Sequence, residues 1–189
     1  MLFLNQINSA NALIVGASQG IGLGFVKKLL DDGKINKIYA AYRNAESATE
    51  LLLLATENPT RLTCLVIDVT NEAQITEALQ QIKSEVKTLH LVINCVGVLH
   101  DGDFQPEKSL RHLNIENLTR YFQVNSIGSV LLAKHLVPLF KHQDNSVFAS
   151  ISAKVASIGD NNLGGWYGYR ASKTALNMFM RNVSIEYAR

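Results

Sequence analysis

The sequence predicts an α/β fold in which helices cover both faces of a doubly wound parallel sheet. Five short apolar runs alternate with segments whose apolar residues recur at helical spacing. The runs are far enough apart for right-handed crossover helices, which neighbouring parallel strands require. The chain has 189 residues, the size of one domain, so we expect residues 1–189 to form a single domain with about five strands.

The expected elements follow one another in regular order. The runs that predict strands are residues 12–15, 37–42, 62–67, 89–95 and 146–151. The segments with helical spacing are residues 21–30, 45–55, 71–86, 115–140 (one or two helices) and 169–187. The run at 89–95 is apolar on both faces, as a central parallel strand should be. Thr70 or Asn71 is suited to cap the helix that follows it.

Composition excludes several classes of protein. Hydrophobic residues make up 47% of the chain and charged residues 18%, which excludes a disordered polypeptide. The 18 Lys and Arg residues nearly balance the 16 Asp and Glu residues, so we expect no nucleic-acid partner and no anionic membrane surface. No stretch approaches the ~18 uninterrupted apolar residues of a membrane span. We therefore expect a cytoplasmic protein.

Cysteine and histidine give no sign of a disulfide framework or a metal site. Cys64 and Cys95 each lie inside an apolar run, which indicates buried thiols in a reducing compartment. The histidines show no ligand spacing, so we expect packing or surface roles for them and no bound metal. They are His90, His100, His112, His135 and His142.

A glycine-rich turn joins the first expected strand to the first helix. It reads Gly16-Ala17-Ser18-Gln19-Gly20-Ile21-Gly22. Glycine relieves the steric cost of so tight a turn, and it also leaves the helix N-terminus open to a pyrophosphate. A plain turn uses glycine too. The position after a buried strand and before an amphipathic helix favours a nucleotide site.

These motifs resemble those of the short-chain dehydrogenases/reductases. The glycine spacing, Asp68 in Ile67-Asp68-Val69, the stretch Asn94-Cys95-Val96-Gly97, and Asn125 stand where that family has its motifs. Residues 164–173 look most like the C-factor and sniffer-type carbonyl reductase branch. The resemblance implies a Rossmann-type sheet with strand order 3-2-1-4-5 and a nicotinamide cofactor. The residues expected to bind that cofactor are Gly16, Ser18, Gln19, Gly20, Ile21, Gly22, Arg43, Asp68, Val69, Asn94, Gly97, Tyr169 and Lys173.

Tyr169 and Lys173 lie four residues apart on the last expected helix, so both project from one face. An ammonium group one turn away should lower the pKa of the phenol toward the range of acid–base catalysis. The resemblance implies that Tyr169 donates a proton to a carbonyl, that Lys173 also binds the nicotinamide ribose, and that Asn125 helps to hold a relay water. Tyr167 has no such partner, because residue 171 is alanine.

The serine of the family motif is altered in this chain. Relatives have Ile-Ser-Ser at the end of the fifth strand, and the second serine polarises the substrate carbonyl. This chain reads Ile151-Ser152-Ala153. Neighbouring strand residues face opposite ways, so Ser152 replaces the lost hydroxyl only after a local shift. Ser152 is therefore a candidate catalytic residue, and the alternative is a hydroxyl bound to the backbone.

The end of the second expected strand indicates which nicotinamide the site prefers. No acidic residue stands there to accept a hydrogen bond from the adenosine ribose, and the first carboxylate is Glu46. Arg43 offers a guanidinium suited to a 2′-phosphate, which favours NADP(H) over NAD(H). The alternative is an arginine that caps the sheet edge in solvent. Gln19 weakens the case, because NADP-preferring relatives often have a basic residue at that position.

The chain reaches Arg189 inside the helix that carries the Tyr-x-x-x-Lys pattern. Compared with the family, the sequence therefore predicts a C-terminally truncated enzyme without the segment that covers the substrate. One hypothesis is an oxidoreductase acting on a small carbonyl or alcohol. The alternative is a catalytically weak nucleotide-binding or signalling protein of the same fold. Relatives also imply a homo-oligomer, a dimer or tetramer, for which the candidate contacts are Ile127, Leu131, Leu132, Met178 and Phe179.

Overall fold

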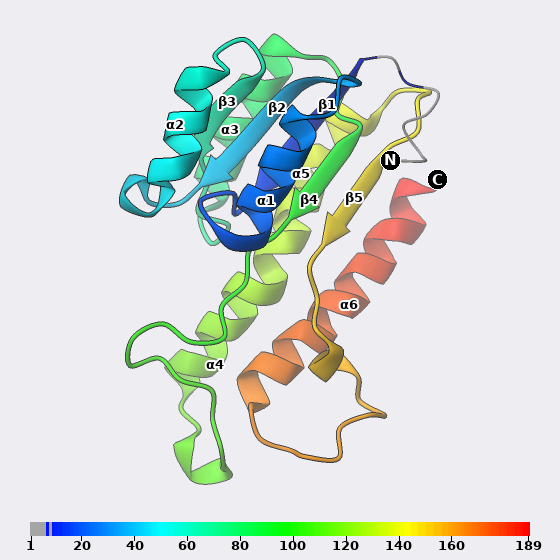
Figure 1. Cartoon of the computed structure of the whole chain (residues 1–189). Helices are drawn as coiled ribbons and strands as arrows, with labels where there is room; N and C mark the ends of the chain where they lie inside the picture. Colours follow the sequence, from blue (N-terminus) through cyan, green and yellow to red (C-terminus); the bar gives the residue numbers. More distant parts are fainter. Residues whose placement is uncertain (1–6, 8) are drawn as a thin grey trace.

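The computed structural model describes residue 7 and residues 9–189, so residues 1–6 and 8 of the expected domain lie outside the described residues. It contains a five-stranded sheet in the order β3-β2-β1-β4-β5, and every neighbouring pair is parallel (Figure 1). This confirms the predicted fold class and strand order. The strands are β1 (Ala10–Val15), β2 (Ile35–Tyr42), β3 (Leu62–Val66), β4 (Leu91–Asn94) and β5 (Val147–Ser150).

Helices connect these strands at the predicted places. They are α1 (Gly20–Leu30), α2 (Thr49–Glu57), α3 (Glu72–Glu85), α4 (Ile115–Phe122), α5 (Gly128–Phe140) and α6 (Tyr167–Tyr187). A short 3₁₀ turn, Ala45–Ala48, precedes α2. Of the two candidate residues, Asn71 is the N-cap of α3, because its side-chain oxygen accepts hydrogen bonds from the backbone N–H groups of Ala73 and Gln74.

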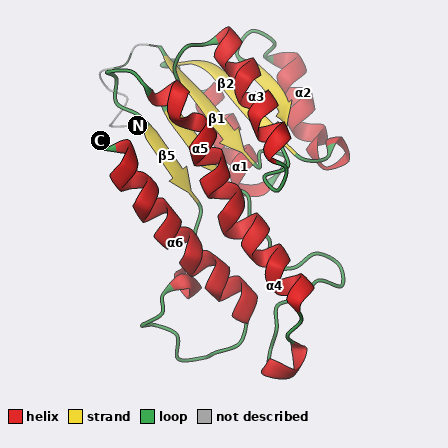
Figure 2. Ribbon diagram, turned by 180° about the vertical axis from the view of Figure 1, so that it is seen from behind, coloured by secondary structure: helices red, strands yellow, loops and turns green. Residues whose placement is uncertain are grey.

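Two apolar layers flank the sheet because successive strand residues face opposite sides. Ala12 and Ile14 of β1 pack in one cluster with α1 and α2. Leu13 and Val15 pack on the other side with α3 and α5. Figure 2 shows this second face, where α3, α5 and α6 lie side by side. All of β1 is buried, which explains why its sequence lacks the alternation of a half-exposed strand.

The segment 115–140 is two α-helices joined by a π-helical turn, Gln123–Ile127. The backbone N–H of Gly128 donates to the carbonyl of Gln123, five residues earlier. One extra residue is thus accommodated in the helix, and such π segments are common at functional sites. The turn contains Asn125, whose side chain is buried.

The last helix begins two residues earlier than the apolar spacing indicates. Trp166 precedes it in the left-handed region with φ of 50°, an uncommon conformation for a non-glycine residue. Helices α4 and α6 run past the carboxyl ends of the strands, so their facing ends extend beyond the sheet beside the loop that follows β4 (Figures 1 and 2). This corner of the molecule holds the candidate site.

Candidate active site

The glycine turn after β1 is held by backbone hydrogen bonds. The N–H groups of Gly16 and Ala17 donate to the carbonyl of Ala41 on β2, at 3.0 and 2.8 Å. Gly16 has φ of 79°, a left-handed conformation suited to glycine. A Cβ on Gly22 would collide with the carbonyl oxygen of Gly16, so α1 packs directly on the turn. The Gln19 side chain does not cap α1, which leaves the first N–H groups of this helix for an anion.

A cavity of about 420 Å³ lies over this turn, at the carboxyl ends of the strands. It brings together seven of the residues that the sequence predicts for cofactor binding. They are Gly16, Ser18, Gln19, Arg43, Asp68, Val69 and Gly97. The cavity, the uncapped helix end and the close-packed glycines are a combination that fits a dinucleotide. Arg43 is exposed, so it is available at the cavity rim.

The remaining predicted cofactor residues lie elsewhere. Gly20 and Ile21 stand in the first turn of α1, and the Ile21 side chain is 61% exposed. Asn94 is buried and has a structural role: its amide donates to the Ser129 hydroxyl at 2.7 Å, and its oxygen accepts from the N–H of Val96 at 3.1 Å. Asn94 therefore shapes the loop that follows β4.

Asp68 also uses its carboxylate locally. One carboxylate oxygen accepts from the backbone N–H and the hydroxyl of Thr70, and the Asp68 N–H donates to the Gln74 side chain at 2.8 Å. These bonds fix the connection between β3 and α3, where Asp68 lines the cavity.

Lys173 and Asn125 meet beside Gly97. Lys173 is 3% exposed, and its Nζ donates to the Ile151 carbonyl at 2.8 Å. A Cβ on Gly97 would lie 3.1 Å from this Nζ and 3.5 Å from Asn125 Oδ1. The Asn125 amide binds the loop after β4 through one residue, because it accepts from the N–H of Val98 and donates to the carbonyl of Val98. It also donates to the Ser172 hydroxyl on α6.

Tyr169 stands one turn before Lys173, in an aromatic surround. Its ring meets those of Tyr121 and Trp166 edge-on, each with centroids 6.2 Å apart. Burial raises the pKa of Tyr169 above its ordinary value and lowers the pKa of Lys173 to about 8. The prediction that Lys173 lowers the phenol pKa is not met here, because desolvation is the dominant effect on both groups.

Ser152 is not directed at this group. Its hydroxyl donates to the side-chain oxygen of Asn177 at 2.7 Å. Asn177 lies eight residues beyond Tyr169 on α6, about 12 Å along the helix axis. The alternative of a strand-end hydroxyl bound to the backbone is not what is found either, since the partner is a side chain. The Ser152 hydroxyl therefore does not stand in for the one that Ala153 lacks.

Two charged residues of the site were not predicted. Glu107 is 2% exposed, and its carboxylate accepts from the N–H of Gly168 in the first turn of α6 at 3.1 Å. It therefore anchors the helix end that carries Tyr169. Arg120 lines the cavity and pairs with Asp101 at 2.7 Å. Each is a single charge in a polar stretch, and the sequence carries no periodic signal for it.

Comparisons with known proteins agree with this geometry. The family model described as short chain dehydrogenase matches residues 10–189. The benzil reductase ((S)-benzoin forming) of Saccharomyces cerevisiae is 28% identical over 181 residues, which cover 92% of this chain and 64% of that protein. An uncharacterized oxidoreductase of Schizosaccharomyces pombe is 28% identical over 175 residues, 93% of this chain and 66% of that protein. This chain thus spans about two thirds of the length of these relatives.

Solved structures are similar over nearly the whole chain. The NADPH-bound carbonyl reductase from chicken fatty liver has a TM-score of 0.85 and 28% identity, and the match covers 96% of this chain and 72% of that one. The carbonyl reductase Sniffer of D. melanogaster has a TM-score of 0.83 and 26% identity, with 95% and 75% coverage. The chain belongs to the short-chain dehydrogenase/reductase family, and its resemblance to the sniffer-type carbonyl reductases is confirmed. Within the described residues, no helix is long and apolar enough to cross a membrane.

Gly22→Ala should weaken NADPH binding and lower the free energy of unfolding by about 1–3 kcal/mol, because the new methyl group pushes α1 off the turn. Gly24→Ala is the matched control. This glycine lies in the same helix with nothing within 4 Å of its Cβ position, so alanine should stabilise by about 0.5–1 kcal/mol. Urea unfolding and fluorescence titration with NADPH measure both effects. Equal behaviour of the two variants would contradict the packing argument.

Burial of Lys173 should make stability depend on pH in a defined direction. Its pKa falls from the ordinary 10.5 to about 8 on folding, so the unfolded chain holds more protons between these values. The free energy of unfolding attributable to this group should therefore rise as pH increases from about 8 toward 10.5. Lys173→Met should remove that rise. Urea unfolding of both proteins at several pH values gives the difference in stability, which would not depend on pH if the folded lysine kept its ordinary pKa of 10.5.

Proposed function

We propose that this chain is the cofactor-binding and catalytic part of an NADP(H)-dependent oxidoreductase that transfers hydride between nicotinamide and a small carbonyl or alcohol substrate. The observation that carries the proposal is the grouping of Tyr169, Lys173 and Asn125 beside a cavity lined by the glycine turn. Family membership and the names of the similar carbonyl reductases support it. This chain spans about two thirds of the length of those relatives, so we also propose, by analogy with them, the activity of the whole protein.

Residues of the cavity divide the task of holding the dinucleotide. Gly16, Ser18 and the uncapped first turn of α1 would receive the pyrophosphate, because backbone N–H groups there lack helical partners. Asp68 and Val69 would lie by the adenine, and Arg43 by the ribose. NADP(H), when bound, supplies or accepts the hydride.

The side chains of α6 supply the proton chemistry. A raised pKa keeps the Tyr169 phenol protonated at neutral pH, which suits proton donation to a carbonyl oxygen. Lys173, buried with a pKa lowered to about 8, stands one turn away, where its ammonium group would bind the nicotinamide ribose. Asn125 fixes the β4 loop against α6 through Val98 and Ser172. Because the Ser152 hydroxyl is bound to Asn177, Tyr169 is the group of this cluster that would polarise the carbonyl.

We also propose that the protein forms a homo-oligomer, either a dimer or a tetramer. Of the candidate contact residues, Leu132 is fully buried in the core and is unavailable. Met178 on α6 is 63% exposed and Ile127 is 39% exposed, so these two remain suited to a contact between copies.

Tyr169→Phe tests the reaction. The variant keeps the ring and removes the acid, so turnover of small aldehydes and ketones, followed by NADPH absorbance, should fall by ~100-fold or more. Tyr167→Phe is the matched control: this phenol begins the same helix but has no lysine four residues on, so its loss should leave turnover unchanged. Equal rates for wild type and Tyr169→Phe would refute the mechanism. No turnover in either, with NADPH still bound, would favour the catalytically weak nucleotide-binding protein.

Arg43→Ala tests the preference for NADP(H). Removing the guanidinium should weaken NADPH binding by about 10-fold or more, the equivalent of one charge-assisted hydrogen bond, and leave NADH binding unchanged. Titration of both cofactors by fluorescence gives the two dissociation constants. An equal loss for NADH would mean that Arg43 acts on the shape of the loop, and similar affinities in the wild type would remove the preference.

A further inference from the structure

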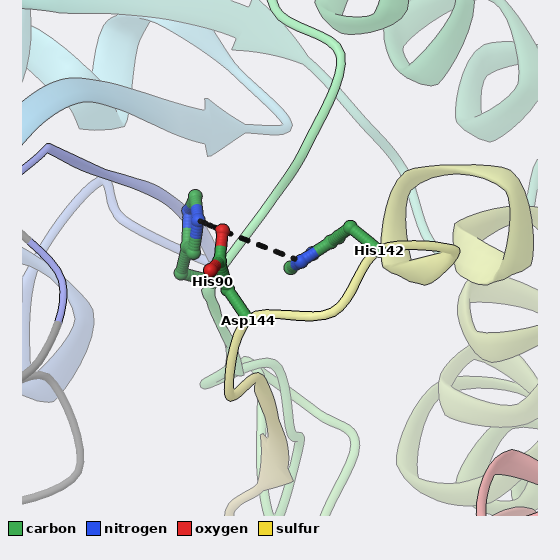
Figure 3. Close-up of side chains that lie close together, drawn as sticks. All are labelled: His90, His142 and Asp144. Carbon is green, nitrogen blue, oxygen red and sulfur yellow. Dashed lines mark ion pairs between the residues drawn. The ribbon is translucent and has the colours of Figure 1, made fainter.

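Two histidines and an aspartate lie close together at the amino-terminal ends of the strands, opposite the end that carries the glycine turn. His90 immediately precedes β4, while His142 and Asp144 lie in the connection from α5 to β5. Each residue offers one ligand atom, an imidazole nitrogen or a carboxylate oxygen, and these three atoms all lie within 4.8 Å of one another. Figure 3 shows the carboxylate between the two rings.

We propose that His90, His142 and Asp144 form a binding site for a divalent transition-metal ion such as Zn²⁺. Imidazole nitrogens and one carboxylate oxygen are ligands that this ion prefers. The site is independent of the proposed oxidoreductase activity.

The state of the His142 ring is the strongest support. Its side chain is only 9% exposed, and its Nε2 lies 3.0 Å from the Leu89 carbonyl. A carbonyl accepts only, so Nε2 carries a proton, and the Ser146 hydroxyl 3.2 Å from Nε2 then faces it as an acceptor. In the neutral ring, Nδ1 therefore carries a lone pair. This Nδ1 is buried and has no hydrogen-bond partner among the described residues. A ring whose second nitrogen donates to a backbone carbonyl has the outer-sphere arrangement usual for metal-binding histidine.

The partner facing that lone pair is also an electron-pair donor. Asp144 Oδ2 lies 3.9 Å from His142 Nδ1 and 3.5 Å from His90 Nε2. The His142 lone pair and the Asp144 carboxylate, which face each other, attract a positive ion between them. In a tetrahedral zinc site with bonds of ~2.0–2.1 Å, neighbouring ligand atoms are about 3.4 Å apart. The two Asp144 separations exceed this value by about 0.1 and 0.5 Å, which the exposed Asp144 side chain can supply. The ligand nitrogens of the two histidines lie within 4.8 Å of each other, so they would have to approach by up to about 1.4 Å through movement of the loop that carries His142.

His90 needs one rearrangement before it binds the ion. Its Nδ1 accepts from the backbone N–H of Asn11 at 3.1 Å, so without metal its proton lies on Nε2, toward Asp144. An ion on Nε2 takes the place of that proton, and the ring takes up a proton on Nδ1, which breaks the bond from Asn11. The cost is this hydrogen bond together with a buried Asn11 N–H that then faces a second N–H donor, and the affinity of the three-ligand site has to exceed it.

The location indicates what the ion would do. His90 belongs to the start of β4, and the N–H of Val147 at the start of β5 donates to the His90 carbonyl. An ion bound by His90 and by the loop residues would join the amino ends of these two strands. Because it binds the folded chain, it would raise the melting temperature as its concentration increases.

The experiment titrates the full 189-residue chain, freed of metal by chelator and dialysis, with ZnCl₂ in a calorimeter. We expect one ion per chain, and Co²⁺ in its place should give the visible absorption of a tetrahedral site. His142→Ala should weaken Zn²⁺ binding by more than ~100-fold, the upper end of the loss caused by removing even an outer-sphere partner. Asp144→Asn should have a similar effect, and its exposed position leaves the fold intact.

His135→Ala is the matched control, because His135 and Glu72 form a second histidine–carboxylate contact, at 2.7 Å, outside the cluster. It should leave Zn²⁺ binding unchanged. NADPH titration of every variant reports on the fold and on the cofactor site separately from the metal. The proposal is overturned if the wild type does not bind Zn²⁺ saturably, if His142→Ala and Asp144→Asn bind it as tightly as the wild type, or if binding is lost in His135→Ala instead.

Discussion

The reversal of strand order between β1 and β4 is the constraint on which the candidate active site depends. From β1 the chain winds to one side, through β2 to β3, and from β4 it winds to the other. The loops that leave β1 and β4 therefore diverge and open a crevice at the carboxyl ends. These two loops are in contact where they leave the sheet, since a Cβ on Gly16 would lie 3.1 Å from the backbone nitrogen of Val96. The floor of the cavity is thus fixed by contact between two backbones.

Buried polar side chains then join the walls of this crevice to the sheet. Asn125 binds the backbone of Val98, and Lys173 binds the carbonyl of Ile151. Buried polar groups are costly unless they are hydrogen bonded. Each of these side chains therefore fixes the position of its helix relative to the end of a strand. The π-helical turn makes this possible for Asn125, because the extra residue shifts the helix that carries it. The same bonds that satisfy the polar groups also set the spacing of the site.

Much of this arrangement could be predicted from the sequence, because it depends on local patterns. Strand runs such as 89–95, the cap at Asn71 and the glycine turn each have a signal a few residues long. The π-helical turn has no such signal, since one inserted residue hardly changes the apolar period. The Ser152–Asn177 bond and the anchoring of α6 by Glu107 depend on contacts between residues far apart in sequence. Single-sequence patterns do not contain that information.

The histidines show the same limit at the other end of β4. His90 and His142 are separated by 52 positions, and only the pairing of β4 with β5 brings them together. Both ends of this apolar strand now carry a buried polar side chain, His90 at 3% exposure and Asn94 at 1%. Asn94 has its partners in Ser129 and Val96, whereas the cluster around His90 leaves the His142 lone pair facing a carboxylate. One rule, that buried polar groups need partners, thus explains a satisfied network at the carboxyl end and points to an ion at the amino end.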